Sequence, residues 1–263
     1  MSLRFKKIFE RQSKKLVTFT TGGDPDLETS KKILEIIADN NIDIVEIGMP
    51  FSDPMADGPT IQLSSSRAIN NGITLDDIFN IANYLRNKKP DIPIILMGYY
   101  NVIHSYGINS FVNKCKNNQI DGLIIVDLQP EEDTELNELL KKNNIDLIRL
   151  ITPTTNEDRL KTILSNASGF LYYVTITGIT GQHSANLEEL KNSIKIIKNH
   201  TNLPVIAGFG IKDANDVKEI CQIADGAVVG SSIVKIIEEN YKNKSIMLNK
   251  IFNFTKELKK GSV

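Results

Sequence analysis

Two carboxylates, Glu46 and Asp57, have positions in this chain that suggest acid–base chemistry. Glu46 interrupts an apolar run at residues 44–47 that is typical of a buried strand, where an ionised carboxylate loses much of its hydration energy. Asp57 follows a loop that prolines interrupt. Two carboxylates that reach one cleft from different environments can divide the roles of acid and base. A structural salt bridge and an ordinary Ser-Asp-Pro turn are the non-catalytic alternatives.

The elements that must position these residues are eight apolar runs, which alternate with amphipathic segments. The runs lie at residues 16–20, 44–47, 94–97, 122–126, 147–151, 170–174, 204–207 and 227–229. Parallel strands covered by helices give this pattern, and eight units in 263 residues predict an α/β fold, a single (β/α)8 TIM barrel. We expect one domain over residues 1–263, with extra helices at the N-terminus, after strand 2 and at the C-terminus.

Chemistry in TIM barrels gathers at the carboxyl ends of the strands, so Glu46 and Asp57 are expected on the active face. Glycine-rich segments at 207–210 and 229–232 follow the last two predicted strands. Backbone N–H groups there can approach an anion, and the second segment opens a helix, so the substrate is expected to carry a phosphate. The candidate phosphate-binding residues are Gly208, Phe209, Gly210, Gly230 and Ser231. Residues 175–186, rich in small and polar side chains, suit a mobile lid.

Composition excludes several other classes of protein. The formal net charge of -1 gives no basic excess to hold nucleic acid. The chain lacks an apolar signal core and any run long enough to span a membrane, so a cytoplasmic location is expected. Cys115 and Cys221 lie in helical patterns and are expected to be reduced packing residues. The three histidines do not show zinc-ligand spacing, so no metal is expected.

Residues 46–62, Glu-Ile-Gly-Met-Pro-Phe-Ser-Asp-Pro-Met-Ala-Asp-Gly-Pro-Thr-Ile-Gln, closely resemble the signature of the tryptophan synthase alpha subunit family. The resemblance extends over most of the chain, from residues 18–25 to 230–238. It implies a barrel lyase that splits indole-3-glycerol phosphate into indole and glyceraldehyde 3-phosphate in tryptophan biosynthesis. It also implies a beta subunit partner in an α2β2 heterotetramer, with pyridoxal phosphate in the beta subunit and no cofactor in this chain.

The resemblance assigns roles to individual residues. Glu46 is expected to be the catalytic acid and base, and Asp57 to bind the indole N–H. The other matched positions are Phe19 and Ile61 around the indole, Tyr172 in the substrate site, and Thr180 and Gly181 in the closing lid. The loops after strands 2 and 3, including residues 52–55 and 101–106, are expected to face the beta subunit because they carry Pro, Met and Tyr.

Four positions depart from the family pattern, and one of them is His104, where relatives can carry Phe. Ile176 stands in the lid where some relatives have an arginine, so lid closure is expected to be weaker. Pro130 lies one position later than in the usual Asp-x-Pro of the docking loop. Arg149 interrupts the fifth predicted strand and needs a carboxylate or water beside it, and the sequence does not identify a partner.

Other functions remain open from the sequence. A stand-alone indole-3-glycerol phosphate lyase that releases free indole would need the same residues. A Schiff-base aldolase would need a lysine on a barrel strand, and the interiors of the eight runs contain none. A chain that mainly activates a partner is a third possibility, against which the presence of both Glu46 and Asp57 argues.

Overall fold

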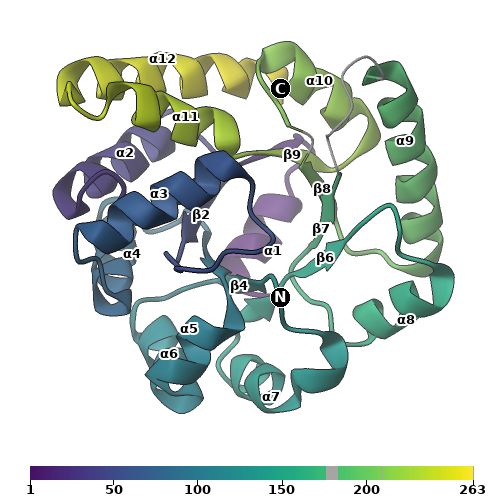
Figure 1. Cartoon of the computed structure of the whole chain (residues 1–263). Helices are drawn as coiled ribbons and strands as arrows, with labels where there is room; N and C mark the ends of the chain where they lie inside the picture. Colours follow the sequence, from purple (N-terminus) through teal and green to yellow (C-terminus); the bar gives the residue numbers. More distant parts are fainter. Residues whose placement is uncertain (176–182, 209, 263) are drawn as a thin grey trace.

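The computed structural model describes residues 1–175, 183–208 and 210–262, and it confirms the predicted TIM barrel. Figure 1 shows the strands gathered at the centre of the molecule inside a ring of helices. The strands form one nine-stranded sheet in the order β5-β4-β3-β2-β1-β9-β8-β7-β6, and every paired neighbour is parallel.

The strands are β1 (Lys15–Thr21), β2 (Ile44–Gly48), β3 (Ile94–Gly98), β4 (Gly122–Ile125), β5 (Asp146–Leu147), β6 (Arg149–Ile151), β7 (Leu171–Val174), β8 (Val205–Gly208) and β9 (Gly226–Val229). The helices are α1 (Leu3–Phe9), α2 (Leu27–Asp39), α3 (Pro59–Asn70), α4 (Leu75–Lys88), α5 (Tyr100–Tyr106), α6 (Ile108–Asn117), α7 (Thr134–Lys142), α8 (Glu157–Ser165), α9 (His183–His200), α10 (Ala214–Ile223), α11 (Ser231–Asn240) and α12 (Lys244–Gly261), with a short 3-10 turn η1 (Pro130–Glu132).

Polar residues at the helix starts explain several of these boundaries. Asp26 accepts a hydrogen bond from the Thr29 N–H before α2, and Asn156 caps α8 in the same way. Thr74 and Asp77 form a reciprocal capping box at α4. Each cap satisfies backbone N–H groups that the first helical turn leaves unpaired.

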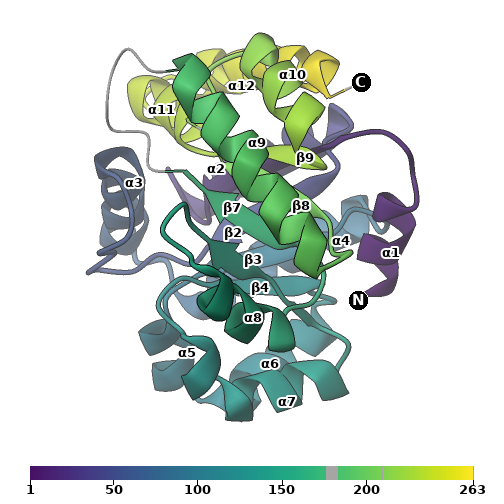
Figure 2. The same ribbon diagram turned by 90° about the vertical axis from the view of Figure 1, so that its right-hand side faces the viewer.

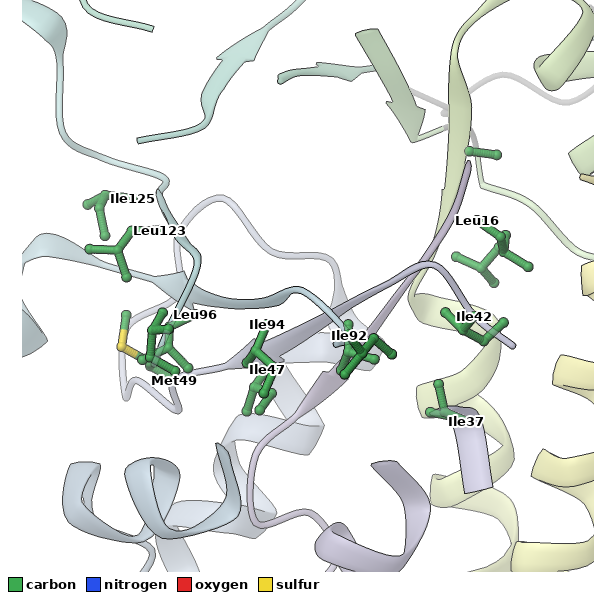
Figure 3. Close-up of a cluster of buried hydrophobic side chains, with 14 of the residues drawn as sticks. Leu16, Ile37, Ile42, Ile47, Met49, Ile92, Ile94, Leu96, Leu123 and Ile125 are labelled. Carbon is green, nitrogen blue, oxygen red and sulfur yellow. The ribbon is translucent and has the colours of Figure 1, made fainter. Parts of the chain in front are cut away.

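Two hydrophobic cores lie on opposite sides of the barrel wall. The inner core includes Val17, Ile44 and Ile95 from the strands, and Phe5 and Ile8 of α1 join it. Helix α1 therefore closes the end of the barrel opposite to α3 (Figure 2). The outer core packs the strands against the helices, and Figure 3 shows part of it around β2 and β3.

The fifth predicted strand is broken at Ile148, which the sequence did not indicate. β5 pairs with β4, whereas β6 pairs with β7, so β5 and β6 are the two ends of the hydrogen-bonded sheet. Ile148 connects β5 to β6 along the chain, so the barrel is closed at this point by a covalent connection and not by strand pairing. The Ile148 N–H donates to the Leu123 carbonyl at 2.9 Å, which keeps the two ends together.

Arg149, directly after the break, has the carboxylate partner that a buried arginine needs. Its buried guanidinium forms an ion pair with Asp133, which is also buried and precedes α7. Its Nη1 also donates to the Leu128 carbonyl at 3.4 Å. Arg149 therefore fastens the segment between β4 and α7 to the outer face of β6.

The structure corrects two other expectations. Residues 101–106, expected to be a loop, lie in helix α5, which contributes the buried Ile103 to the outer core. The amphipathic segment at 131–143, whose pattern predicts one helix, is divided, because Pro130 and the two following glutamates form η1 and the regular helix starts only at Thr134.

Removing one partner of the buried Arg149–Asp133 pair should destabilise the chain strongly. Asp133→Ala leaves the Arg149 charge buried and unpaired, which costs about 3–5 kcal/mol of unfolding free energy. The matched control is Glu131→Ala, which removes the exposed Glu131–Arg159 pair and should change stability little. Urea unfolding of the three proteins measures the difference. Equal stability of the two variants would show that the Arg149 pair does not hold this segment.

Candidate active site

Glu46 lies inside the barrel at the C-terminal half of β2. In the strand register it stands between Phe19 of β1 and Ile95 of β3, and its side chain is fully buried. Neither carboxyl oxygen has a hydrogen-bond partner among the described residues. Burial therefore raises the pKa of Glu46 from 4.5 to about 8. At neutral pH the group is an uncharged acid that carries a proton.

Asp57 lies in the loop that joins β2 to α3, immediately before the helix N-cap residue Gly58. Its Oδ2 accepts a hydrogen bond from the Tyr99 hydroxyl at 3.1 Å. Burial raises the pKa of Asp57, and the hydrogen bond from Tyr99 opposes that rise. The two carboxyl groups therefore have different environments, as the sequence predicted.

Helix α3, which carries Ile61, is fastened to the loop after β1. Arg67 donates from Nε and Nη2 to the two carboxylate oxygens of the buried Asp24, both at 2.8 Å. This paired geometry fixes direction as well as distance. Ile61 is partly buried in the first turn of α3, four positions after Asp57.

Tyr172 of β7 lies near both carboxyl groups and also near the end of β8. Burial raises the pKa of its hydroxyl, and the charges of Glu46 and Asp57 raise it further, so all three groups share one region. A Cβ atom added at Gly208 of β8 would lie 3.0 Å from the Tyr172 hydroxyl. The ring of Tyr172 therefore lies against the end of β8.

Phe19 fills the space between β2 and β9, where two glycines make room for it. A Cβ atom added at Gly48 would lie 2.6 Å from the Phe19 ring, and one at Gly230 would lie 3.2 Å from the Cβ of Phe19. Phe19 is 9% exposed. The structure thus places an aromatic ring between Glu46 and the predicted phosphate site.

The predicted phosphate site has the expected backbone geometry in its described part. Gly210 has φ +62°, a left-handed conformation that favours glycine, and Ser231 is the first residue of α11. Neither a side-chain cap nor an acidic residue occupies the first turn of α11. Ser232 donates to the Ile211 carbonyl at 2.6 Å and ties the two loops together. The N–H groups of this helix start can therefore bind an anion.

Four predicted positions, Ile176, Thr180, Gly181 and Phe209, lie outside the described residues. The structure describes Cys115 and Cys221 as free and buried, which confirms that prediction. Within the described part of the chain, the acidic, histidine and cysteine side chains do not form a group of three that could hold a metal ion. The helices described there do not include one long and apolar enough to cross a membrane.

Sequence reasoning missed Tyr99, which contacts the predicted active-site loop. Its side chain is 3% exposed and lies at the end of β3, directly before α5. The signal was its place after an apolar run, because residues that follow barrel strands face the same end as Glu46. The residues after Tyr99 show no clear helical period, so the sequence did not distinguish Tyr99 from an exposed loop residue.

Comparison with known proteins decides the family. The family model described as tryptophan synthase alpha chain matches residues 5–263. The chain belongs to the tryptophan synthase alpha chain family. The tryptophan synthase alpha chain of Petrotoga mobilis is 44% identical over 256 residues, which cover 97% of this chain and 98% of that protein.

Solved structures agree with this assignment. Tryptophan synthase subunit alpha from Legionella pneumophila superposes with a TM-score of 0.91 at 33% identity, covering 99% of this chain and 98% of that one. A chain of tryptophan synthase from M. tuberculosis, in an aminoacrylate-bound form, gives a TM-score of 0.88 at 25% identity and covers 100% of both chains. These findings support the alpha-subunit function of the tryptophan synthase alpha chain family and give no support to a stand-alone lyase.

The buried Glu46 should make the stability of this alpha chain fall as pH rises. Between its ordinary pKa of 4.5 and its folded value of about 8, the folded state keeps a proton that the unfolded state loses. The stabilisation by that proton is complete below pH 4.5 and is lost as pH rises to about 8.

Urea unfolding at several pH values compares the wild type with Glu46→Gln, which cannot titrate. The unfolding free energy of the wild type should fall relative to that of Glu46→Gln by up to about 1.4 kcal/mol per pH unit between pH 4.5 and about 8. Above this range the difference should be constant. Parallel profiles for the two proteins would mean that Glu46 titrates normally in the folded chain.

Proposed function

We propose that Glu46 and Asp57 carry out the family's reaction in this chain. That reaction is the cleavage of indole-3-glycerol phosphate to indole and glyceraldehyde 3-phosphate, a carbon–carbon lyase step of tryptophan biosynthesis. The chain acts as the alpha subunit and forms a complex with a beta subunit. The observation that carries the residue assignment is the fully buried Glu46, protonated at neutral pH, with Asp57 and Tyr172 in the same region.

The reaction needs two proton transfers, and Glu46 is suited to both. Protonation of indole C3 makes the ring an electron sink, and deprotonation of the hydroxyl next to the scissile bond drives the cleavage. Glu46 holds a proton below pH 8 and donates it to C3. The carboxylate that remains then accepts the hydroxyl proton as the carbon–carbon bond breaks, which restores the acid.

Asp57 acts through its charge. As C3 is protonated, positive charge develops on the indole nitrogen, and a carboxylate that accepts the N–H stabilises that charge. The Tyr99 hydroxyl donates to Oδ2 of Asp57, and we assign the hydrogen bond from the indole N–H to Oδ1. Phe19 and Ile61 supply apolar surface for the ring, and Tyr172 lines the substrate site between the indole and the phosphate.

The phosphate is held at the ends of the last two strands. We assign it to Gly208, Phe209, Gly210, Gly230 and Ser231, because the start of α11 offers uncapped N–H groups there. Thr180 and Gly181 belong to the lid that closes over the substrate. Binding by backbone groups anchors the substrate at a fixed distance from the two carboxyl groups.

The remaining assignments concern the assembly. Residues 1–263 form one domain that works in the cytoplasm, in an α2β2 heterotetramer with the beta subunit. In this family the beta subunit carries pyridoxal phosphate, and this chain uses no cofactor of its own. The loop with Asp57 faces that partner, since Met55 is 85% exposed two positions before Asp57 and would be buried by docking.

Replacing either carboxyl group should abolish most of the activity. Glu46→Gln keeps the shape but cannot exchange the proton, a role that typically contributes about 10²- to 10⁴-fold. Asp57→Asn loses the charge that stabilises the developing indolium. Formation of glyceraldehyde 3-phosphate from indole-3-glycerol phosphate measures the rate, and competition by glycerol phosphate checks that the site still binds. A turnover within tenfold of wild type for Glu46→Gln would contradict its assignment.

Disturbing the phosphate site should weaken substrate binding more than turnover. Gly210→Val places a branched side chain where φ is +62°, and it should raise KM for indole-3-glycerol phosphate about tenfold or more by displacing backbone donors. Gly72→Val is the matched control, since Gly72 also has a positive φ (+73°) but lies between α3 and α4. Equal use of phosphate-free indole glycerol by the wild type would show that the phosphate site has no role.

A further inference from the structure

Tyr99 holds the loop of Asp57 at three points. Its hydroxyl donates to Asp57 Oδ2 at 3.1 Å and accepts the Ala56 N–H at 3.1 Å. Its ring stacks on Phe51 of the same loop, with centroids 5.2 Å apart and planes 30° apart. One buried side chain from β3 therefore contacts the start and the end of the segment that carries Asp57.

The backbone around Tyr99 is itself fixed. The N–H of Met49 donates to the Met97 carbonyl at 2.7 Å, and the N–H of Val126 donates to the Gly98 carbonyl at 2.9 Å. The next residue, Tyr100, donates its N–H to Asp127 at 2.7 Å. Hydrogen bonds thus connect the ends of β2, β3 and β4. They hold the backbone of Tyr99 in place, and its hydroxyl lies beside the loop of Asp57, whose tip is exposed.

We propose that Tyr99 is a positioning residue for the cleavage reaction, which engages Oδ2 of Asp57 and leaves Oδ1 directed to the indole N–H. This inference rests on the proposed role of Asp57. The hydroxyl of Tyr99 satisfies both the carboxylate and the neighbouring Ala56 N–H, so the loop has one preferred arrangement before substrate binds. Preorganised groups of this kind need not reorient as charge develops on the substrate.

The electrostatic surroundings give the proposal a measurable signature. Among the described residues, Tyr99 after β3 and Tyr172 of β7 interact with Asp57, while Asp127 after β4 acts on Tyr99 and Glu46 acts on Tyr172. Burial raises the pKa of Asp57, while the Tyr99 hydrogen bond lowers it. Without that bond the Asp57 pKa rises, so a larger share of the molecules lacks the required carboxylate at low pH.

The test is the pH profile of kcat/KM for Tyr99→Phe, measured as glyceraldehyde 3-phosphate formation by the chain saturated with its beta subunit. We expect the acid limb to move to higher pH by about one unit and kcat/KM at pH 7 to fall about 10- to 100-fold, the range for a hydrogen bond to a charged group. The basic limb, set by Glu46, should not move. A loss of structure alone would lower the whole profile without moving one limb.

The matched control is Tyr84→Phe, which removes the hydroxyl hydrogen bond of Tyr84 to Glu35 at 2.6 Å, between α4 and α2. This bond lies on the helical layer, away from the carboxyl ends of the strands, and its loss should leave both limbs in place. If Tyr99→Phe gives the same profile as Tyr84→Phe while Asp57→Asn is inactive, the proposal is wrong. If Asp57→Asn stays active, the role of Asp57 itself fails, and this outcome is distinct.

A second variant covers the case in which Tyr99→Phe does not fold. Incorporation of 3-fluorotyrosine at position 99 keeps the ring and the hydroxyl and makes the hydroxyl a stronger donor. The Asp57 pKa should then fall, and the acid limb should move to lower pH, in the opposite direction to the effect of Tyr99→Phe. An unchanged acid limb in a folded 3-fluorotyrosine protein would overturn the proposal.

Discussion

The site depends on the burial of Glu46, whose carboxyl oxygens have no hydrogen-bond partner in the described part of the chain. A carboxyl group in this position stays protonated near neutral pH because the strand, and not a neighbouring charge, sets its pKa. The cost is that a positive charge or a strong hydrogen-bond donor placed beside Glu46 would favour its ionisation and remove the acid. The apolar neighbours of Glu46 in the inner core and the ring of Phe19 therefore have a chemical role as well as a packing role.

The rest of the barrel places groups around that carboxyl without changing its environment. Asp57 comes from a loop, where a tyrosine hydroxyl opposes the effect of burial on its pKa. The proposed phosphate site would use backbone N–H groups at the start of α11, whose first turn carries no acidic side chain. The proposed acid and carboxylate thus belong to β2 and to the loop after it, whereas the proposed anion site follows β8 and β9.

The sequence predicted the parts of this arrangement that depend on local pattern. Apolar runs located the strands, Glu46 was notable because it interrupts one of them, and the glycines after the last two strands indicated the anion site. The break at Ile148 could not be predicted, because the run from 147 to 151 is apolar except for Arg149 and only the pairing of its neighbours divides it. Helix α5 was missed because its seven residues show too few turns for a clear period. Tyr99 and Asp133 were missed as partners because their contacts span 42 and 16 positions of the chain.

The break at Ile148 also determines how a change at one strand end can reach the others. The regular strand pairing ends at β5 and β6, and across the break the ring is closed by the chain itself and by the hydrogen bond from the Ile148 N–H to Leu123 of β4. A displacement of the segment after β4 can therefore reach β2 through β3, and it can reach β7 through Ile148 and β6. Two routes therefore join Glu46 to Tyr172, one through the strands that bear Phe19 and the proposed anion site, and the other through β3, β4 and the break at Ile148.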